Sequence, residues 1–191
     1  MAFTKDNTKL LLFGQSSERL LFRQLKESDF EEWLKFCRDD TSLKYIWLTD
    51  ENAAEKKCAV WFDRVFYRYQ NNLGGMNALI EKSNREFVGQ CGLLVHTIQG
   101  IEELEVGYSL MPKYRGQGYA LEAATMCRDY AFEHKLSNSL ISIIHIDNKE
   151  SEKVAIRNGM TLDKTTTYNN SRVNIFRIDR HDWEIKKSQH S

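Results

Sequence analysis

In this 191-residue chain, two glycines in a short polar segment mark a place where backbone N–H groups could bind a ligand. Residues 115–120 read Arg-Gly-Gln-Gly-Tyr-Ala, and Gly116 and Gly118 leave the backbone open to a ligand. Small and apolar residues then recur at helical spacing over 119–131. Because the first amides of a helix lack internal partners and carry partial positive charge, the segment predicts an anion site that suits a pyrophosphate. The alternative is an ordinary turn between a strand and a helix.

A single carboxylate stands on one face of the strand expected just before this segment. Glu105 shares that face with Gly107 and Ser109, whereas the other face is apolar: Leu104, Val106, Tyr108 and Leu110. A carboxylate in such a position is a candidate base for taking a proton from an amine. The alternative is a solvated carboxylate on an open face, beside Glu102 and Glu103.

A third polar cluster follows a nearly continuous apolar run over 139–146, which is typical of a strand buried on both faces. Asn148 comes next and begins a short helix that Gly159 ends. Asn148 can cap this helix while Ser151 lies in its first turn. Capping is compatible with a second role, because the same side chains can also hydrogen-bond a ligand.

These three clusters need a scaffold of alternating strands and helices. The pattern predicts one helix near Phe30, capped by Ser28 or Asp29, and another that starts around Asp50 and ends by Asn71. A hairpin turn is expected at Gln99-Gly100. The apolar residues 10–13 fit either an extra strand or an apolar arm. Strands are expected over 20–25, 77–81, 87–97, 104–110, 139–146, 160–167 and 173–179.

Composition narrows the class of protein. The 27 basic and 27 acidic residues balance, which argues against nucleic acid as a partner, and the length suits one domain. The four cysteines lack Cys-x-x-Cys spacing and are expected to be buried reduced thiols, and the histidines lack a metal-binding pattern. We therefore predict no metal. With neither a signal segment nor an apolar run long enough to span a membrane, we expect a soluble cytoplasmic protein with no membrane partner.

Together the motifs resemble the GNAT superfamily of N-acetyltransferases. Arg115-x-x-Gly118-x-Ala120 after a strand resembles the family's coenzyme A pyrophosphate loop. Residues 148–160, with the pattern Asn-x-x-Ser-x-x-Val-x-x-Arg-x-Gly-Met, resemble the second signature at the family's distance from that loop. The string GYSLMPKYRGQGYALEA is most similar to the RimJ/RimL-like branch, whose members acetylate protein N-termini and, in relatives, small amines.

The resemblance covers residues 17 to about 179 and implies an α/β fold in a single domain. We expect the GNAT fold, a mixed and mostly antiparallel central sheet flanked by helices, with splayed strands that hold the pantetheine arm. The domain would span 19–180, after an N-terminal extension over 1–18 and before a polar, frayed tail over 181–191. In the family, the first two helices form a wall of the acceptor cleft. Their aromatic residues are expected to be mainly core, with any exposed member lining that cleft: Trp33, Trp47, Trp61, Phe66 and Tyr67.

The resemblance also implies a set of residues that bind acetyl-CoA, the acetyl donor. The strand expected over 104–110 would splay from its neighbour at a bulge. An N–H near Ser109 or Leu110 would then hydrogen-bond the thioester oxygen. Asn148 could hydrogen-bond the pantetheine. The pyrophosphate would be held by the side chain of Arg115 and the amides of Gly116, Gln117, Gly118, Tyr119 and Ala120.

Two residues become candidates for catalysis by this resemblance: Glu105 as base and Ser151 as acid. Many family members carry a tyrosine where this chain has Ala155, and serine at 151 is the RimJ/RimL-like pattern. A serine hydroxyl is a poor acid, so a tyrosine such as Tyr108 is an alternative donor. The expected reaction is direct attack by a primary amine, first of all a protein N-terminal α-amine, in a ternary complex. Alternatives are a polyamine or aminoglycoside acceptor, or a non-catalytic coenzyme A module; the sequence allows a monomer or a homodimer.

Overall fold

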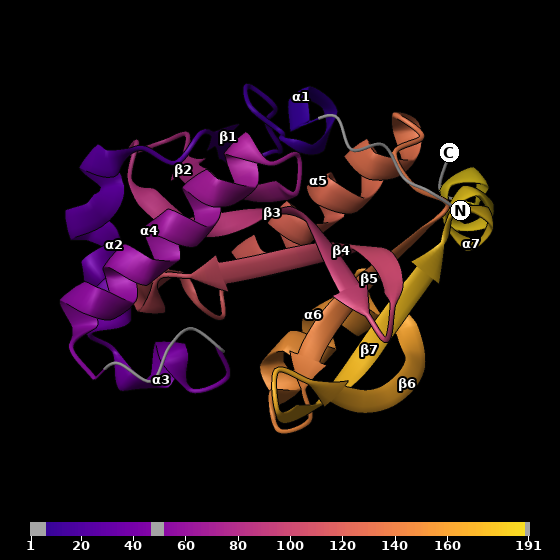
Figure 1. Cartoon of the computed structure of the whole chain (residues 1–191). Coiled ribbons are helices and arrows are strands. Elements are labelled where there is room, and N and C mark those ends of the chain that lie inside the picture. The colour runs from indigo at the N-terminus through magenta and orange to yellow at the C-terminus, as the bar shows by residue number, and fades with distance from the viewer. Residues whose placement is uncertain (1–6, 47–51, 190–191) are drawn as a thin grey trace.

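A seven-stranded sheet runs through the computed structural model, which describes residues 7–46 and 52–189 (Figure 1). The order is β1-β2-β3-β4-β5-β7-β6, and every neighbouring pair is antiparallel except β4 and β5. The expected mixed, mostly antiparallel α/β fold is therefore confirmed. The strands are β1 (Leu20–Arg23), β2 (Gly74–Glu81), β3 (Phe87–Ile98), β4 (Ile101–Leu110), β5 (Ser139–His145), β6 (Thr161–Tyr168) and β7 (Ser171–Asp179).

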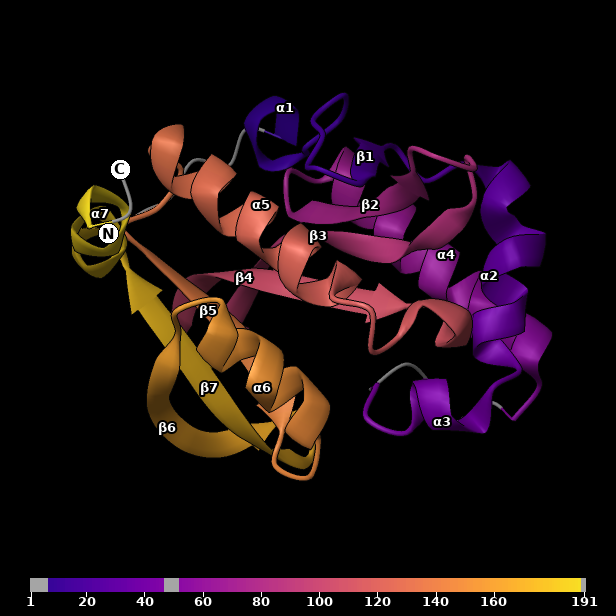
Figure 2. The same ribbon diagram turned by 180° about the vertical axis from the view of Figure 1, so that it is seen from behind.

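Helices cover both faces of the sheet. Helices α2 (Phe30–Cys37) and α4 (Ala54–Gln70) lie in front of it in Figure 1. Helices α5 (Tyr119–Glu133) and α6 (Lys149–Arg157) lie on the opposite face, as Figure 2 shows. The shorter elements are α1 (Asn7–Leu10), α3 (Asp40–Leu43), α7 (Arg180–Ser188) and the 3-10 turns Glu27–Asp29 and Pro112–Tyr114. Within the described ranges, no helix is both long enough and apolar enough to cross a membrane.

The core forms where apolar helix faces meet the sheet. Helix α4 buries residues at helical spacing, Cys58, Trp61, Phe62 and Val65. Helix α5 instead presents small residues, including Ala123, Ala124 and Ala131, which let it pack closely on β3 and β4. Of the aromatic residues predicted to be core, Trp33 and Trp61 are buried, whereas Tyr67 is 59% exposed. Trp47 lies outside the described residues.

Strands β4 and β5 diverge almost at once. Along the described chain they pair only at Glu105 and Ile141, while β4 pairs with β3 through ten consecutive residues without a shift of register. The expected bulge in β4 is therefore wrong. Side chains maintain the split instead: Ser142 Oγ donates to the Val106 carbonyl at 2.9 Å, and the Ile143 amide donates to Glu105 Oε1 at 3.3 Å. These bonds satisfy buried backbone groups that a ladder would otherwise pair.

The two ends of the chain are more structured than the sequence indicated. Leu10 and Leu12 are fully buried, and the Leu12 amide donates to the buried Asn77 side chain at 3.0 Å. This segment is the end of α1 and a turn, not a strand. The prediction of a frayed C-terminal tail is wrong, because α7 follows β7 directly and buries Trp183. Arg180 and Lys186 add hydrogen bonds from α7 to the carbonyls of Ser137 and Gly159. All four cysteines are buried and free.

We expect Trp183→Ala to lower the free energy of unfolding by about 3 to 5 kcal/mol, the range for truncating a buried aromatic side chain. Trp183 packs on Phe132 with ring centroids 5.4 Å apart and donates from Nε1 to Asp129 Oδ1 at 2.7 Å. Urea denaturation measures the effect, and His181→Ala on the exposed face of α7 is the matched control. Equal stability of the two variants would mean that α7 contributes nothing to the fold.

Candidate active site

The glycine-containing loop lies between β4 and α5 with its residues 115–118 exposed. Gly116 and Gly118 have φ of 74° and 85°, the left-handed region that favours glycine. A Cβ built at Gly116 would meet nothing within 4 Å, so this position opens onto free space. Gly118 is the N-cap of α5, and its carbonyl accepts from the Glu122 amide at 3.0 Å. The loop thus ends where unpaired helix amides begin.

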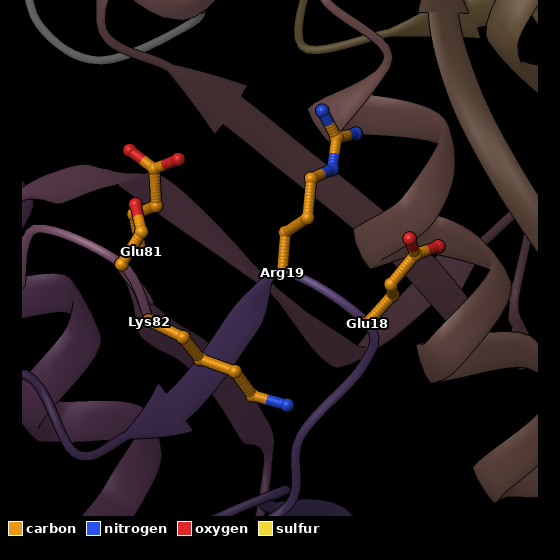
Figure 3. Close-up of a pocket in the computed structure, with 5 residues that line it drawn as sticks. Glu18, Arg19, Glu81 and Lys82 are labelled. Atoms are coloured by element: carbon orange, nitrogen blue, oxygen red, sulfur yellow. The ribbon is translucent and has the colours of Figure 1, made fainter.

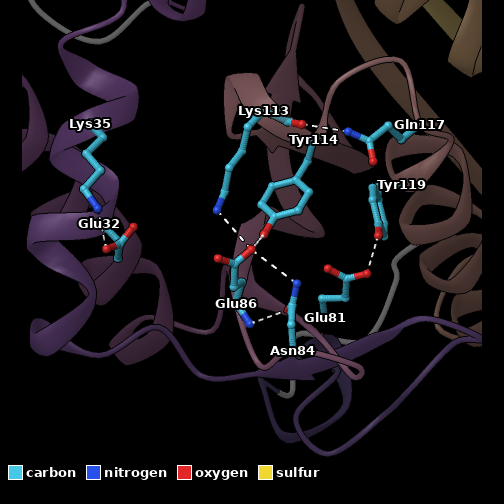
Figure 4. A network of polar contacts seen from close by, with 9 residues as sticks. All are labelled: Glu32, Lys35, Glu81, Asn84, Glu86, Lys113, Tyr114, Gln117 and Tyr119. Atoms are coloured by element: carbon cyan, nitrogen blue, oxygen red, sulfur yellow. Dashed lines mark hydrogen bonds and ion pairs between the residues drawn. The ribbon is translucent and has the colours of Figure 1, made fainter.

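The turn between β2 and β3 braces this loop through two carboxylates (Figure 4). Glu86 accepts from the hydroxyl of Tyr114 and pairs with Lys113 Nζ at 3.0 Å. Glu81 accepts from the hydroxyl of Tyr119 at 2.6 Å. The two tyrosine rings meet nearly at right angles, with centroids 5.6 Å apart. Both ends of the loop are therefore anchored on the same hairpin.

Arg19, at the start of β1, adds a cation beside the loop that the sequence reasoning missed. Its Nε pairs with Glu122 Oε2 at 2.6 Å, and its Nη1 donates to the Gln117 carbonyl at 3.1 Å. Its guanidinium lies 4.0 Å from the centre of the Tyr119 ring. A hollow beside the loop, shown in Figure 3, is lined by Glu18, Arg19, Glu81, Lys82 and Ser83. Arg19 thus ties β1 to the first turn of α5.

Arg115 is held by the segment around α3. Its Nη1 donates to Thr41 Oγ1 at 3.2 Å and lies 3.4 Å from Asp39 Oδ2, and its Nη2 bonds Ser42 Oγ. Its Nε donates to the Leu110 carbonyl at 3.2 Å. Hydrogen bonds from Ser42 and Thr41, together with the charge of Arg115, lower the pKa of Asp39. Arg115 therefore connects the end of β4 to α3.

The main chain of β4 alternates between its two neighbours. The Met111 amide donates to the Val88 carbonyl at 2.9 Å, and the register with β3 is continuous before it. Because hydrogen-bonded and non-bonded pairs alternate in an antiparallel ladder, Ser109 directs its main-chain groups to β3. Tyr108 and Leu110 direct theirs to the side of β5, which has already diverged. This leaves an extended stretch of backbone with no strand beside it.

Glu105 stands at the base of the divergence and is not a solvated carboxylate. Its side chain is 13% exposed, and Oε2 lies 2.8 Å from His96 Nε2. The other oxygen accepts from the Ile143 amide. The hydroxyl of Tyr168 lies 2.8 Å from His96 Nδ1. Glu105 thus belongs to a partly buried polar cluster with His96 and Tyr168, to which side chains or amides of β3, β4, β5 and β6 contribute.

Arg68 on α4 completes this cluster from above the sheet. Its Nη2 lies 3.3 Å from His96 Nε2, while Nη1 donates to the carbonyls of Leu73 and Val95. Burial lowers the pKa of Arg68, and the charge of Glu105 opposes that shift. The sequence carried two weak signals for this group: Arg68 follows the buried Val65 at helical spacing, and His96 ends an apolar run of β3.

Asn148, Ser151 and Tyr108 come together on the other face of the sheet. Asn148 Oδ1 accepts from the Ser151 amide at 3.2 Å, which confirms the predicted N-cap of α6. The Tyr108 hydroxyl donates to the Ser151 carbonyl at 3.0 Å. Burial raises the pKa of Tyr108, so its hydroxyl keeps its proton at neutral pH. Two proton donors therefore lie on one face and the Glu105 carboxylate on the other.

The segment that holds Arg115 also reaches the end of β5. Tyr45, just after α3, donates to the Asp147 carbonyl at 3.2 Å, and its ring stacks on His145 with centroids 5.1 Å apart. Residues 39–45 therefore touch the ends of both diverging strands. In the part of the chain that the structure describes, no three His, Cys, Asp or Glu side chains gather as they would around a metal ion.

Comparison with known proteins identifies the family of this arrangement. The family model described as "Acetyltransferase (GNAT) domain" matches residues 19–161. Among relatives in Bacillus subtilis strain 168, YkkB is 38% identical over 85 residues, which are 44% of this chain and 49% of that protein. The N-acetyltransferase YoaA is 23% identical over 145 residues, 75% of this chain and 80% of YoaA. The match to YkkB thus spans about half the length of that relative.

Solved structures share the fold over most of their length. An acetyltransferase from Agrobacterium tumefaciens str. C58 has a TM-score of 0.72 at 25% identity, covering 86% of this chain and 92% of that one. A ribosomal-protein-serine acetyltransferase from Vibrio cholerae, named as putative, gives 0.70 at 17%, covering 87% and 97%. Spermidine N-acetyltransferase from Vibrio cholerae gives 0.67 at 13%, covering 87% and 98%. At such identities the last two show the fold alone.

We expect Glu105→Ala to lower the free energy of unfolding by about 3 kcal/mol, because Arg68 and the Ile143 amide would lose a buried charged partner. Glu105→Gln keeps an oxygen for the Ile143 amide and is expected to cost less. Chemical denaturation of both variants tests this, with Glu184→Ala on the exposed face of α7 expected within about 0.5 kcal/mol of the unsubstituted protein. Similar losses for Glu105→Ala and Glu184→Ala would contradict the structural role of the cluster.

Proposed function

Because the chain belongs to the GNAT acetyltransferase family, whose enzymes use acetyl-CoA, we propose that it acetylates protein N-terminal α-amines in the manner of the RimJ/RimL-like branch. One observation carries the proposal. The mostly buried Glu105 carboxylate lies on the α4 face where β4 and β5 diverge, and just beyond it the amides of Tyr108 and Leu110 are directed to the side where no described strand pairs with β4. The amine would approach from the side of α4 and attack the acetyl donor directly, in a ternary complex.

The residues around the divergence fit acetyl-CoA, which supplies an activated acetyl thioester when bound. The open space at Gly116 and the amides over 116–120 suit its pyrophosphate, and Asn148 suits the pantetheine. The Leu110 amide, directed to the open side of β4, would donate to the thioester oxygen and stabilise the charge that develops there. Of the two candidates from the sequence, this geometry favours Leu110 over Ser109. Arg115 adds positive charge beside the loop while α3 holds its guanidinium.

Glu105 would take a proton from the acceptor amine. Its neighbours compensate the charge of a carboxylate: Arg68 supplies positive charge, and His96 and the Ile143 amide donate hydrogen bonds. An ionised carboxylate stabilised in this way is a weak base. An α-amine, with a pKa of about 8, loses its proton far more readily than a lysine amine at about 10.4. The base therefore suits an N-terminal amine.

The thiolate that leaves needs a proton donor on the opposite face. The Tyr108 hydroxyl is protonated at neutral pH and lies beside Ser151, to whose carbonyl it donates. Ser151 Oγ, in the first turn of α6, would hydrogen-bond the sulfur without itself supplying the proton. Burial makes Tyr108 a weaker acid than an exposed tyrosine, so its position alone makes it our candidate acid, with Ser151 as the partner that stabilises the thiolate.

A polyamine acceptor has less support from the charges around Glu105. On α4, Arg68 lies in the cluster and Arg64 is close enough to act on the pKa of Arg68 and of Tyr168. Glu103, the nearest further carboxylate on β4, pairs with Arg177 at 2.7 Å. A polycation would therefore meet one carboxylate among arginines. A protein N-terminus carries a single positive charge, so the arginines around Glu105 repel it less than they repel a polyamine.

We expect Glu105→Gln to bind acetyl-CoA normally and to lose at least about a hundredfold in acetyl transfer, the usual contribution of a general base. Thiol release is measured with acetyl-CoA against N-terminal peptides, spermidine and aminoglycosides, and calorimetry measures cofactor binding. Peptide turnover by the unsubstituted protein supports the proposal. If spermidine is the only acceptor that is acetylated, the acceptor is a polyamine and not a protein N-terminus. Unchanged turnover by Glu105→Gln would remove Glu105 from the mechanism.

We expect Gly116→Ala to weaken acetyl-CoA binding by about tenfold, equal to about 1.4 kcal/mol, because the new methyl group occupies the space proposed for the pyrophosphate. Gly100→Ala is the matched control. Gly100 also has a left-handed φ, 80° against 74°, and a Cβ there also meets nothing within 4 Å. Calorimetric titration compares the two variants. Equal affinities would place the pyrophosphate away from this loop.

A further inference from the structure

A chain of three polar side chains leads from the edge of the sheet to Glu105. Tyr168 ends β6, His96 lies near the end of β3, and Glu105 lies on β4. The Tyr168 hydroxyl is 2.8 Å from His96 Nδ1, and His96 Nε2 is 2.8 Å from Glu105 Oε2. The side chains of His96 and Glu105 are 15% and 13% exposed. Each imidazole nitrogen therefore has one oxygen partner in a site mostly closed to water.

These distances select one imidazole tautomer. A carboxylate only accepts hydrogen bonds, so a nitrogen 2.8 Å from Glu105 Oε2 must carry a proton. Arg68 Nη2 lies 3.3 Å from the same nitrogen and can only donate, so we place the proton by the shorter contact, the one with Glu105. In the neutral imidazole of His96, Nε2 then carries the proton and Nδ1 accepts from the Tyr168 hydroxyl. The opposite tautomer would set a nitrogen lone pair against the carboxylate. The two hydrogen bonds thus point the same way: the Tyr168 hydroxyl donates to His96, and His96 donates to Glu105.

The charges around His96 come from every element packed against it. Arg68 of α4 lies 3.3 Å from Nε2, with Arg64 one turn earlier. Glu103 of β4 is the residue directly opposite His96 in the ladder, and Arg177 of β7 holds its carboxylate. Tyr168 approaches from β6. Arg68 faces Glu105 and Arg177 faces Glu103, so each of these two carboxylates has a guanidinium beside it.

We propose that His96 and Tyr168 are positioning residues for the Glu105 base: Tyr168 fixes the imidazole tautomer, and His96 fixes the carboxylate in its ionised form. The inference rests on the proposed function, because it assigns these residues a part in the same acetyl transfer. Neither residue needs to touch the acceptor. Their effect is to keep Glu105 ionised and oriented where the acceptor amine would approach.

The test measures kcat and KM for the peptide acceptor and for acetyl-CoA across pH in four variants. They are His96→Ala, His96→Gln, Tyr168→Phe and the control His134→Gln, whose imidazole lies on α5 against Tyr130. Losing the His96 hydrogen bond removes a donor that stabilises the charge of the Glu105 carboxylate. In His96→Ala, the acid limb of kcat/KM should therefore move up by about one pH unit, the size of one charge-assisted hydrogen bond.

At neutral pH, His96→Ala should lose about tenfold or more in kcat, with KM for acetyl-CoA unchanged. His96→Gln retains an N–H donor and should stay within about threefold of the unsubstituted protein, with its acid limb in place. Tyr168→Phe should lose a few fold. An unshifted limb in His96→Ala overturns the inference. So does a His96→Gln variant as impaired as His96→Ala, because the imidazole would then act by its own titration.

Nitrogen NMR of the imidazoles gives a readout that does not depend on turnover. We expect the Nε2–H tautomer of His96 in the unsubstituted protein and a mixture of tautomers in Tyr168→Phe. An Nδ1–H tautomer overturns the inference whatever the activity. Failure of the proposed function looks different, since no peptide would then be acetylated by the unsubstituted protein. Turnover that depends on Glu105 but not on His96 overturns this inference alone.

Discussion

Strands β4 and β5 pair at one position and then diverge, and this divergence determines how the site is built. Strand β4 is fully paired with β3, yet beyond Glu105 and Ile141 it faces no strand on its other side along the described chain. Buried backbone groups must find partners, and Ser142 and Glu105 provide them where the strands first separate. Farther along, the Leu110 carbonyl accepts from Arg115, and we propose that the amides of Tyr108 and Leu110 remain for a ligand. The carboxylate that holds the split open must itself be compensated, which accounts for His96 and Arg68.

The gap between β4 and β5 places a carboxylate on one face of the sheet close to hydroxyl donors on the other face. Helix α4 covers one face of the sheet, and helices α5 and α6 cover the other (Figures 1 and 2). The α4 side carries the Glu105 carboxylate beside His96 and Arg68, whereas the other side carries the hydroxyl donors and the glycine loop. Tyr114 and Tyr119 fix that loop to the β2–β3 turn, and Arg115 fixes it to α3. The proposed base and the proposed acid, separated in this way, cannot neutralise each other. They can act on two partners that enter from different faces.

Sequence reasoning succeeded where the determinants lie within a few residues of one another. The loop at Gly116 and the cap at Asn148 depend on local backbone preferences, so a short motif was sufficient for each. It failed where the partners are far apart in the chain. Glu105 looked isolated because Arg68, His96 and Tyr168 reach it only after four strands assemble. The terminal helix α7 was missed because its stability depends on Trp183 docking onto α5, which no local pattern indicates.

Residue-resolved amide hydrogen exchange, with and without coenzyme A, tests the central claim most directly. The claim is that the alternate amides of β4 beyond Glu105 remain for the acetyl donor. We predict that Gly107 and Ser109, directed to β3, are protected in both states, whereas Tyr108 and Leu110 exchange quickly alone and become protected when coenzyme A binds. Equal protection of all four amides without coenzyme A, or no gain at Leu110 on its binding, would contradict the account.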